Sequence, residues 1–286
     1  MKSSILKTLG LTIGLTATSQ AAVLFSTDFG LSTDASNAGL AAFNVGGGQT
    51  NGLGNGALQN SDDAFPADPM GPRDRKVNGG GFSTVRSGGN SSLFAAGSIA
   101  NNGILTFDAN LRTRDKENGI ALVNAAGDII LGMGNTNGLG SLANGEDPEA
   151  FNIVNGSGVI QNFAEGSAGA VGGNFPDITG GSIYLGFRLR VDTSTGAATL
   201  QVQNLAGDAN AVPDFNANTV TSSAFNIPAA DLAALQTATG LFYGQSGGGT
   251  ALDDVTVDFT ETVVPEPSSA LLIGLAGLGL LRRKRA

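Results

Sequence analysis

Short runs in which apolar and polar residues alternate recur along most of the chain. Such alternation is typical of β-strands that bury one face and expose the other. The expected strands, in chain order, are Val23–Phe29, Ile104–Leu111, Gly119–Asn124, Asp128–Met133, Ile183–Val191, Ala197–Gln203 and Leu252–Phe259. Within Ile183–Val191, Arg188 and Arg190 fall on the polar side of the alternation, which predicts a half-buried antiparallel strand.

Glycine-containing turns separate these runs and predict how they connect. Asn124–Gly127 and Asp192–Gly196 each join two neighbouring strands, so we expect a hairpin at both places. The body has one helical pattern, Pro228–Gln236, with Pro at its start and Gly240 beyond its end, and we expect helix near Asp231–Gln236. A dozen or so strands and one short helix predict an all-β fold, an antiparallel β-sandwich of the jelly-roll kind.

Two stretches are poor in alternating apolar residues. Asn44–Asn60 is rich in Gly and Asn, and Ser61–Lys76 is charged and contains Pro, so both are predicted to be long surface loops. The chain shows no fixed-period repeat, which argues against a solenoid or a propeller.

The first 21 residues have the pattern of a secretory signal peptide. Lys2 and Lys7 form a short basic head, and an apolar stretch, Leu9–Ala17, follows. Small residues then lead to a predicted cleavage between Ala21 and Ala22. We therefore expect a signal peptide at 1–21, export across the inner membrane and a β-sandwich body at 22–262. The alternative, a first buried helix, is disfavoured because a strand pattern starts directly after these residues.

The last residues, 263–286, combine three unlike parts in a fixed order. The rigid sequence Pro265-Glu266-Pro267 comes first, and the uncharged, apolar Ser268–Leu281 follows it. Four consecutive cations close the tail: Arg282, Arg283, Lys284 and Arg285. The apolar part is predicted to be a short transmembrane helix, with the cations held on the cytoplasmic side.

This tail resembles the PEP-CTERM sorting signal of Gram-negative bacteria, including the motif Pro265-Glu266-Pro267 itself. The resemblance implies an exosortase-type membrane protease as partner. It also implies an inner-membrane-anchored precursor that is later delivered to the cell surface or the extracellular matrix, and an association with exopolysaccharide or biofilm. The alternatives are an ordinary membrane anchor, which needs about 20 apolar residues, or a buried helix, which would not end in four cations.

The body also resembles a known fold family. The first strand, Leu24–Phe29, and the last, Leu252–Phe259, look like the paired first and last strands of concanavalin-A-like domains, the LamG or lectin/glucanase jelly rolls. The hairpin at Ile183–Gln203 is similar to the long central strands of such domains. This resemblance implies a domain of the kind that binds carbohydrate.

Composition removes several function classes. The chain has no His and no Cys, which excludes Ser-His-Asp triads, thiol nucleophiles, disulfides and nearly all zinc sites. Without its two ends the body keeps 9 Lys and Arg against 23 Asp and Glu, so we expect no nucleic-acid partner. Trp is absent and Tyr occurs twice, so stacking platforms for sugars are scarce, and the 15 Phe must supply most of the core.

Three groups of carboxylates are the candidates for chemistry. They are Asp62, Asp63 and Asp68; Glu146, Asp147 and Glu149; and the pair Asp253 and Asp254. A glycosidase needs two carboxylates that face each other across the scissile bond. The laminarinase-like enzymes of this fold carry a Glu-x-Asp-x-x-Glu pattern, which this chain lacks. We therefore expect no catalytic residues and no enzyme.

Metal binding and anion binding each have one candidate. Asp253 and Asp254 stand at the start of a strand, where lectin-like folds often place a cation ligand, and calcium is the ion that such oxygen ligands would take. Alternatively they only discourage edge pairing; no other cofactor is expected. Arg73, Arg75 and Lys76 could meet an acidic polysaccharide, but a solvated loop accounts for them more simply.

Three hypotheses for function remain open. The leading one is a non-catalytic surface or matrix protein whose sandwich binds carbohydrate, with a polysaccharide as partner. The second is a divergent polysaccharide hydrolase or lyase of the same fold, and the third is a purely structural matrix component. A groove with an exposed aromatic side chain and no facing carboxylate pair would favour the first hypothesis.

Overall fold

The computed structural model describes residues 20–27, 58–60, 75–78, 86–114, 117–136, 150–177, 182–205, 212–245 and 251–262. One compact unit, Ala21–Glu261, holds nearly all of them. A second unit consists of residues 1–20 and 262–286, of which only Gln20 and Thr262 are described. The fold is therefore that of Ala21–Glu261.

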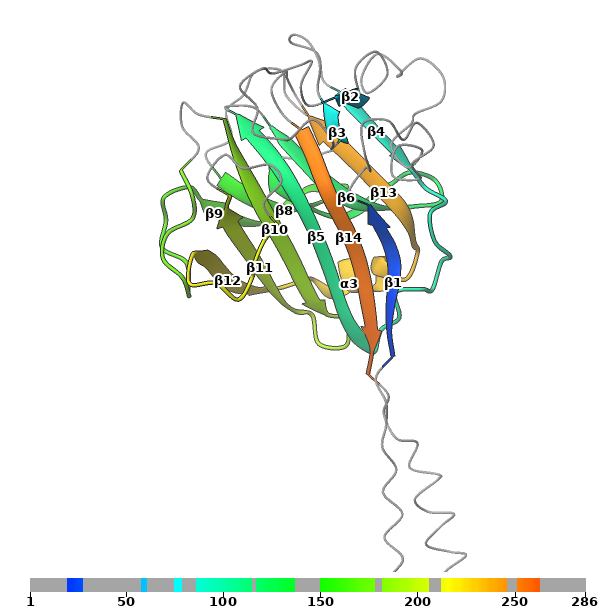
Figure 1. The fold of residues 1–286 in the computed structure, drawn as a ribbon. Coiled ribbons are helices and arrows are strands. Elements are labelled where there is room, and N and C mark those ends of the chain that lie inside the picture. Colours follow the sequence, from blue (N-terminus) through cyan, green and yellow to red (C-terminus); the bar gives the residue numbers. More distant parts are fainter. Residues whose placement is uncertain are drawn as a thin grey trace, which may run out of the picture. The chain divides into compact units, whose positions relative to one another are not determined.

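Two antiparallel sheets packed face to face make up this unit, and Figure 1 shows them as two layers. The eight-stranded sheet has the order β12 (Val220–Asn226), β11 (Ala197–Asn204), β10 (Ser182–Asp192), β5 (Gly103–Arg114), β14 (Ala251–Glu261), β3 (Arg75–Asn78) and β2 (Leu58–Asn60), with β1 (Gln20–Thr27) also paired to β14. The six-stranded sheet has the order β4 (Arg86–Asn90), β13 (Ala238–Gln245), β6 (Asn118–Asn124), β7 (Ile129–Asn135), β8 (Ala150–Asn155) and β9 (Gly158–Ala164). The predicted all-β sandwich is confirmed.

Both predicted hairpins are present. β6 and β7 pair across the turn at Asn124–Gly127, and β10 and β11 pair across Asp192–Gly196. In each turn a side-chain oxygen, from Asn124 or Asp192, accepts backbone N–H groups of the turn, and a glycine closes it with positive φ. These residues supply turn geometry that other residue types adopt only under strain.

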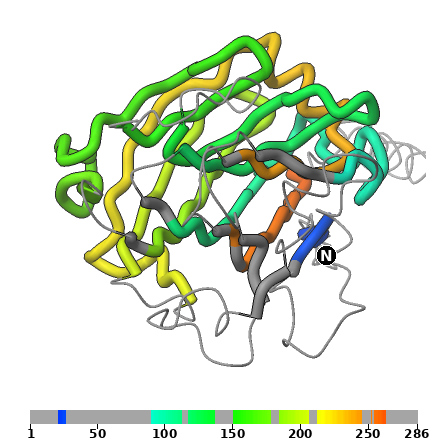
Figure 2. The backbone as a smooth tube through the Cα atoms, turned by 90° about the horizontal axis from the view of Figure 1, so that it is seen from above, coloured from blue at the N-terminus to red at the C-terminus, as the bar shows by residue number. Residues whose placement is uncertain are grey.

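The first and last strands pair, as their sequences predict. β1 lies beside β14 in Figures 1 and 2, and their outward hydroxyls meet 3.0 Å apart at Ser26 Oγ and Thr256 Oγ1. The two arrows in Figure 1 point in opposite directions, so the start of β1 and the end of β14 lie at the same end of the sandwich. This pairing joins two segments separated by 230 positions in sequence.

The one described helix, α3 (Ala229–Leu235), matches the predicted helical segment. It connects β12 of one sheet to β13 of the other, and its residue Leu235 is buried in the core. Its outer side is tied to the end of β8, where Asn155 Nδ2 donates to Asp231 Oδ1 at 2.9 Å. The helix thus covers the interior where the chain crosses between the layers.

Phenylalanine rings join the two sheets, as the composition suggests. Phe151, Phe163, Phe175, Phe187 and Phe225 form a continuous series of contacts with ring centroids 5.2 to 5.8 Å apart. These distances are typical of favourable aromatic pairs. Because the rings come from β8, β9, β10, β12 and one connecting segment, they fix the layers against one another.

A β-bulge interrupts β14. Its register with β5 shifts between Asp253 and Thr256, so two residues of β14 face one residue of β5. Asp254 adopts a φ of 44°, in the left-handed region that Asp and Asn tolerate better than most residues. Owing to the extra residue, Leu252 and Val255 both lie in the core although they are three positions apart.

The two predicted surface loops need correction. Leu58–Asn60 forms β2 within the first, and β3 begins at Arg75, inside the second. Both strands are short, so local alternation cannot reveal them. β3 exists because it pairs with β2 and with Ala251 and Leu252 of β14, a contact between distant segments.

The two ends of the chain carry predictions that the fold does not test. No helix within the described residues is long and apolar enough to cross a membrane, and the predicted helix Ser268–Leu281 lies outside those residues. The same holds for the signal peptide up to Ser19.

Candidate functional site

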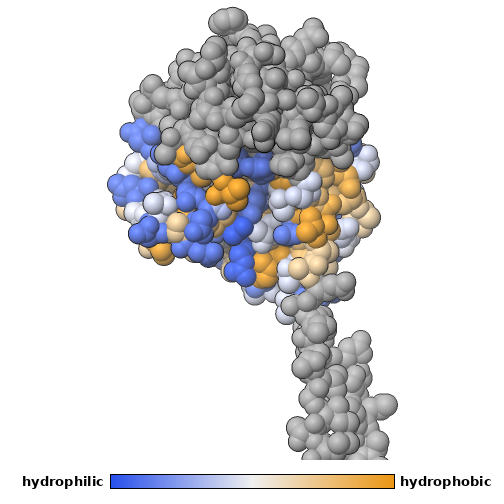
Figure 3. All heavy atoms as spheres, in the orientation of Figure 1, coloured by the Kyte–Doolittle hydropathy of each residue, from blue (hydrophilic) through white to orange (hydrophobic). Residues whose placement is uncertain are grey.

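The outer face of the eight-stranded sheet carries most of its polar side chains. Alternate residues of β5, β10, β11 and β14 point away from the core, and these are Thr106, Asp108, Asn110, Arg188, Arg190, Thr199, Gln201, Gln203, Thr256 and Asp258. Figure 3 looks onto this face, and hydrophilic residues occupy much of its described middle part. A regular sheet holds such side chains in fixed rows.

Arg188 lies at the centre of this face and is held on two sides. Its Nε and Nη2 atoms donate to both carboxylate oxygens of Asp108, at 2.8 and 2.6 Å. Its guanidinium also covers the ring of Phe215, 4.3 Å from the centroid. The pKa of Arg188 lies above its ordinary value, chiefly because Asp108 accepts its hydrogen bonds. These contacts leave Arg188 little freedom to engage another molecule.

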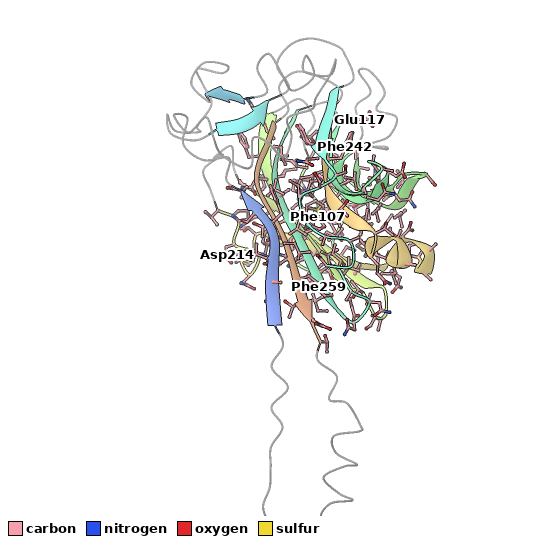
Figure 4. All side chains as sticks on the ribbon, turned by 90° about the vertical axis from the view of Figure 1, so that its right-hand side faces the viewer. Phe107, Glu117, Asp214, Phe242 and Phe259 are labelled. Carbon is pink, nitrogen blue, oxygen red and sulfur yellow. The ribbon has the colours of Figure 1, made fainter. Side chains whose placement is uncertain are left out.

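A chain segment, residues 212–219, crosses the outer face above β10 and β11, and we call it the strap. The side chain of Gln203 makes two hydrogen bonds to the strap: its Oε1 accepts from the N–H of Asp214 at 2.9 Å, and its Nε2 donates to Thr219 Oγ1 at 3.1 Å. The strap comes close because Gly186 has no side chain: a Cβ there would lie 2.5 Å from Pro213 Cγ. In Figure 4, Asp214 lies outside the sheet, whereas Phe107 lies in the interior.

Next to the strap, the face is hollowed into an open groove of about 580 Å³. Its lining consists of Ile104, Arg190, Asp192, Ala197, Ala198, Thr199, Ala224, Phe225 and Asn226. The hollow forms because the outward positions of β11 and β12 here carry small residues, Ala197 and Ala224, while Arg190 and Asp192 stand beside them on β10. The groove therefore has a small-residue floor and polar walls.

The polar side chains of the groove differ in whether they already make hydrogen bonds within the chain. Asp192 Oδ1 accepts hydrogen bonds from Ser194 and Thr195 in its own turn, and these bonds lower the pKa of Asp192. Arg190 is exposed, and no hydrogen bond or ion pair engages its guanidinium within the part of the chain that the structure describes. The side chains of Thr199 and Asn226 are likewise unengaged there.

Among the carboxylates described on this face, Asp258 has the least stabilised negative charge. Its Oδ1 is buried and has no hydrogen-bond partner within the described structure. Burial raises the pKa of Asp258, the negative charge of Asp108 raises it further, and the positive charge of Arg188 acts in the opposite direction. Asp108 and Asp258 are thus two neighbouring carboxyl groups that share one arginine.

The predicted metal pair, Asp253 and Asp254, lies at the bulge of β14. Asp254 Oδ2 accepts a hydrogen bond from Asn110 Nδ2 at 2.7 Å, and Asn110 is only 2% exposed. The described residues contain no group of three or more acidic side chains that could hold a metal ion. Calcium binding by this pair therefore stays a prediction.

The other predicted residues fall into two sets. Ala21 and Ala22 lie exposed in β1, and Arg75 and Lys76 lie in β3. Those outside the described residues are Asp62, Asp63, Asp68, Arg73, Glu146, Asp147, Glu149, Pro265, Glu266, Pro267, Arg282, Arg283, Lys284 and Arg285. The groove itself was not predicted; the alternation in β10 placed Arg190 on the polar face, and that was the one signal available.

Comparisons with known proteins identify the tail. Residues 263–285 match the family model of the PEP-CTERM protein-sorting motif. This match confirms the resemblance drawn from Pro265-Glu266-Pro267. The motif implies an exported protein with a membrane-anchored precursor, and it is a recognition signal for exosortase processing.

For the body, no curated protein matches the chain. Among solved structures, the chain is similar to peanut lectin with a nine-residue peptide, at 10% identity over 87% of this chain and 100% of that chain, with a TM-score of 0.38. It is also similar to lectin II from Ulex europaeus, at 9% identity over 56% and 74%, with a TM-score of 0.32. A third is a tail fiber protein from an E. coli phage, at 18% identity over 63% and 17%, with a TM-score of 0.31. With TM-scores this low, the assignment of the sandwich rests on its own strand pairing.

Proposed function

We propose that this chain is an exported envelope or extracellular-matrix protein whose sandwich binds carbohydrate and does not catalyse a reaction. Its precursor is held in the inner membrane by the tail until an exosortase-type protease processes it, after which the body stays at the cell surface or in the matrix. The tail motif supports the route. The groove beside the strap supports the binding role.

One observation carries the binding proposal: two neighbouring halves of the same face use their polar side chains differently. On the strap side, Arg188, Gln201 and Gln203 are committed to bonds within the chain. On the groove side, the sheet fixes the backbone of Arg190 and Asn226, and their side chains make no hydrogen bond in the described structure. Polar side chains that start from fixed positions and have no partner are available to bind a ligand.

The lining of the groove also suits an amphipathic ligand such as a sugar. Ile104 and the partly buried Phe225 offer apolar surface, while Thr199, Asn226 and Asp192 offer hydroxyl, amide and carboxylate groups. The volume, about 580 Å³, lies within the range of small-ligand sites. One or two sugar rings of a polysaccharide would fit.

The absence of catalysis is proposed from the chemistry of the same groove. Asp192 is the one carboxylate among its lining residues, and its lowered pKa keeps it ionised at neutral pH, so it cannot donate a proton. Glycoside hydrolysis needs a second carboxyl group across the bond, about 5–10 Å away. On the described part of this face, Asp108 and Asp258 are neighbouring carboxyl groups, but Asp108 is bound by Arg188.

The test is a glycan array probed with the full chain in mild detergent, once with calcium and once with a chelator. We expect binding to a polysaccharide fragment. Ala197→Phe, which fills the exposed floor of the groove, should weaken that binding at least about ten-fold, since a bulky side chain would occupy the space of the ligand. Ala164→Phe, at an exposed position of the other sheet, is the matched control and should leave binding unchanged.

Three results would redirect the proposal. Release of reducing sugar from a bound glycan would establish the hydrolase instead. Binding to no glycan would favour the purely structural role. Binding only with calcium would support the predicted site at Asp253 and Asp254.

A further inference from the structure

β10 presents two arginines on the same face, two positions apart, in opposite states. Arg188 is bound by Asp108 through two hydrogen bonds and lies on Phe215. Arg190 is in register with Thr106 on one side and Thr199 on the other, and both neighbours are uncharged. It lines the groove with no bond to its guanidinium in the described structure.

Arg190 is unpaired in a chain of negative net charge. The chain carries 24 acidic residues against 15 Lys and Arg, yet no carboxylate among the described residues pairs with Arg190. The nearest acidic residue on the same strand face, Asp192, instead directs its Oδ1 to the N–H groups and the hydroxyl of its own turn. The positive charge of Arg190 is therefore left facing the groove.

We propose that the groove recognises an acidic saccharide, a uronic acid residue of a polysaccharide, and that Arg190 binds its carboxylate. The guanidinium donates from two parallel N–H groups, which match the two oxygens of a carboxylate. This inference rests on the proposed carbohydrate binding, and it names the class of sugar.

The remaining groups of the groove define the orientation of that sugar. Asp192 is negative at the hairpin end, so it repels a second anionic group and accepts hydrogen bonds from sugar hydroxyls. Thr199 and Asn226 offer further neutral donors and acceptors across the floor. The charges therefore favour an orientation in which the carboxylate of the sugar lies at Arg190 and its hydroxyl groups face Asp192.

The experiment compares a short oligogalacturonate with its methyl ester by calorimetric titration of the full chain in mild detergent. The ester keeps the shape and the hydroxyls but removes the charge. We expect the acid to bind about ten- to a hundred-fold more tightly than the ester, as a charge-assisted pair allows. Arg190→Gln should bring the affinity for the acid down to near that of the ester, and it should weaken binding of the ester much less.

The matched control is Asn216→Asp in the strap. It changes the net charge by the same amount as Arg190→Gln, on the same face, at an exposed position whose side chain makes no bond in the described structure. We expect it to keep the preference for the acid. Circular dichroism of both variants should match the parent chain, because both positions are exposed.

The outcomes separate the two proposals. If acid and ester bind equally and Arg190→Gln changes nothing, the assignment of Arg190 is wrong and carbohydrate binding stands. If Asn216→Asp has the effect of Arg190→Gln, the preference comes from overall charge, which also overturns the assignment. If neither saccharide nor any other glycan binds, the proposed function itself fails.

Discussion

Single side chains decide how the outer face of the eight-stranded sheet is used. Arg188 and Arg190 have the same chemistry, strand and face, yet Phe215 and Asp108 engage only the first. Alternation along β10 predicts that both are outward. It cannot predict the difference, because Phe215 comes from a strap distant in sequence and Asp108 from another strand.

Asp258 offers a prediction at the same scale. Because the pKa of Asp258 is raised, the native state favours its neutral form and is penalised as the pH rises above the ordinary value of this group. Asp258→Asn should therefore raise the free energy of unfolding at pH 7, by up to about 1 kcal/mol for a partly exposed group. The gain should vanish near pH 3, where the carboxyl is neutral in both states.

Urea unfolding of both chains at the two pH values measures this. Asp214→Asn is the control, since Asp214 is exposed and an amide oxygen can still accept from the N–H of Asn216. A variant at Asp258 that is less stable than the parent at pH 7 would contradict the argument, because it would show that Arg188 stabilises the ionised form.

Whole elements were predictable where they are long and local. Seven strands, β1, β5, β6, β7, β10, β11 and β14, and the two hairpins were recognisable, because their alternation and turn residues are local in sequence. The strands β4, β8, β9, β12 and β13 were not predicted, although β13 is eight residues long. β2 and β3 were not predicted either, since each has only three or four residues and is stabilised by pairing with a distant segment, β3 with β14 and β2 with β3. The bulge at Asp254 was hidden for the same reason.

Part of the free backbone edge of β12 is covered by another segment of the chain. Val171 pairs with Ser222 through two backbone hydrogen bonds, so residues 168–174 cover part of its free edge. This cover depends on Gly172, which has a φ of 86° and where a Cβ would lie 1.5 Å from the carbonyl oxygen of Val220. An uncovered edge invites pairing with another molecule.

We therefore expect Gly172→Ala to detach the cover and expose β12. The variant should lose roughly 1–3 kcal/mol of stability from backbone strain and displacement and should self-associate, as measured by light scattering during gel filtration. Gly173→Ala is the matched control: its φ is 110°, but no atom lies near its Cβ position. It should be strained yet monomeric, and equal self-association of both variants would argue against the role of the cover.

At the scale of the whole chain, the tail was the most predictable part because its signal is local and ordered. Removal of residues 263–286 should leave a folded, soluble body, since the compact unit and β14 both end at Glu261. Replacing Arg282, Arg283, Lys284 and Arg285 by Ser should impair membrane retention without changing the body, because these cations would no longer stop translocation. Fractionation of cells and circular dichroism of the truncated protein measure the two effects. A truncated body that aggregates would show that the tail belongs to the core.

The pairing of β1 with β14 has a consequence for the timing of folding. β1 can pair only after β14, whose bonded residue lies 230 positions later in the chain, has been made, and closing so long a segment is slow and entropically costly. We therefore expect the chain to lack this strand pair during export, which would leave the predicted cleavage bond between Ala21 and Ala22 in an unpaired segment. Because β14 ends at Glu261 and the sorting motif begins at residue 263, we expect the sheet to be completed only shortly before the motif reaches the membrane.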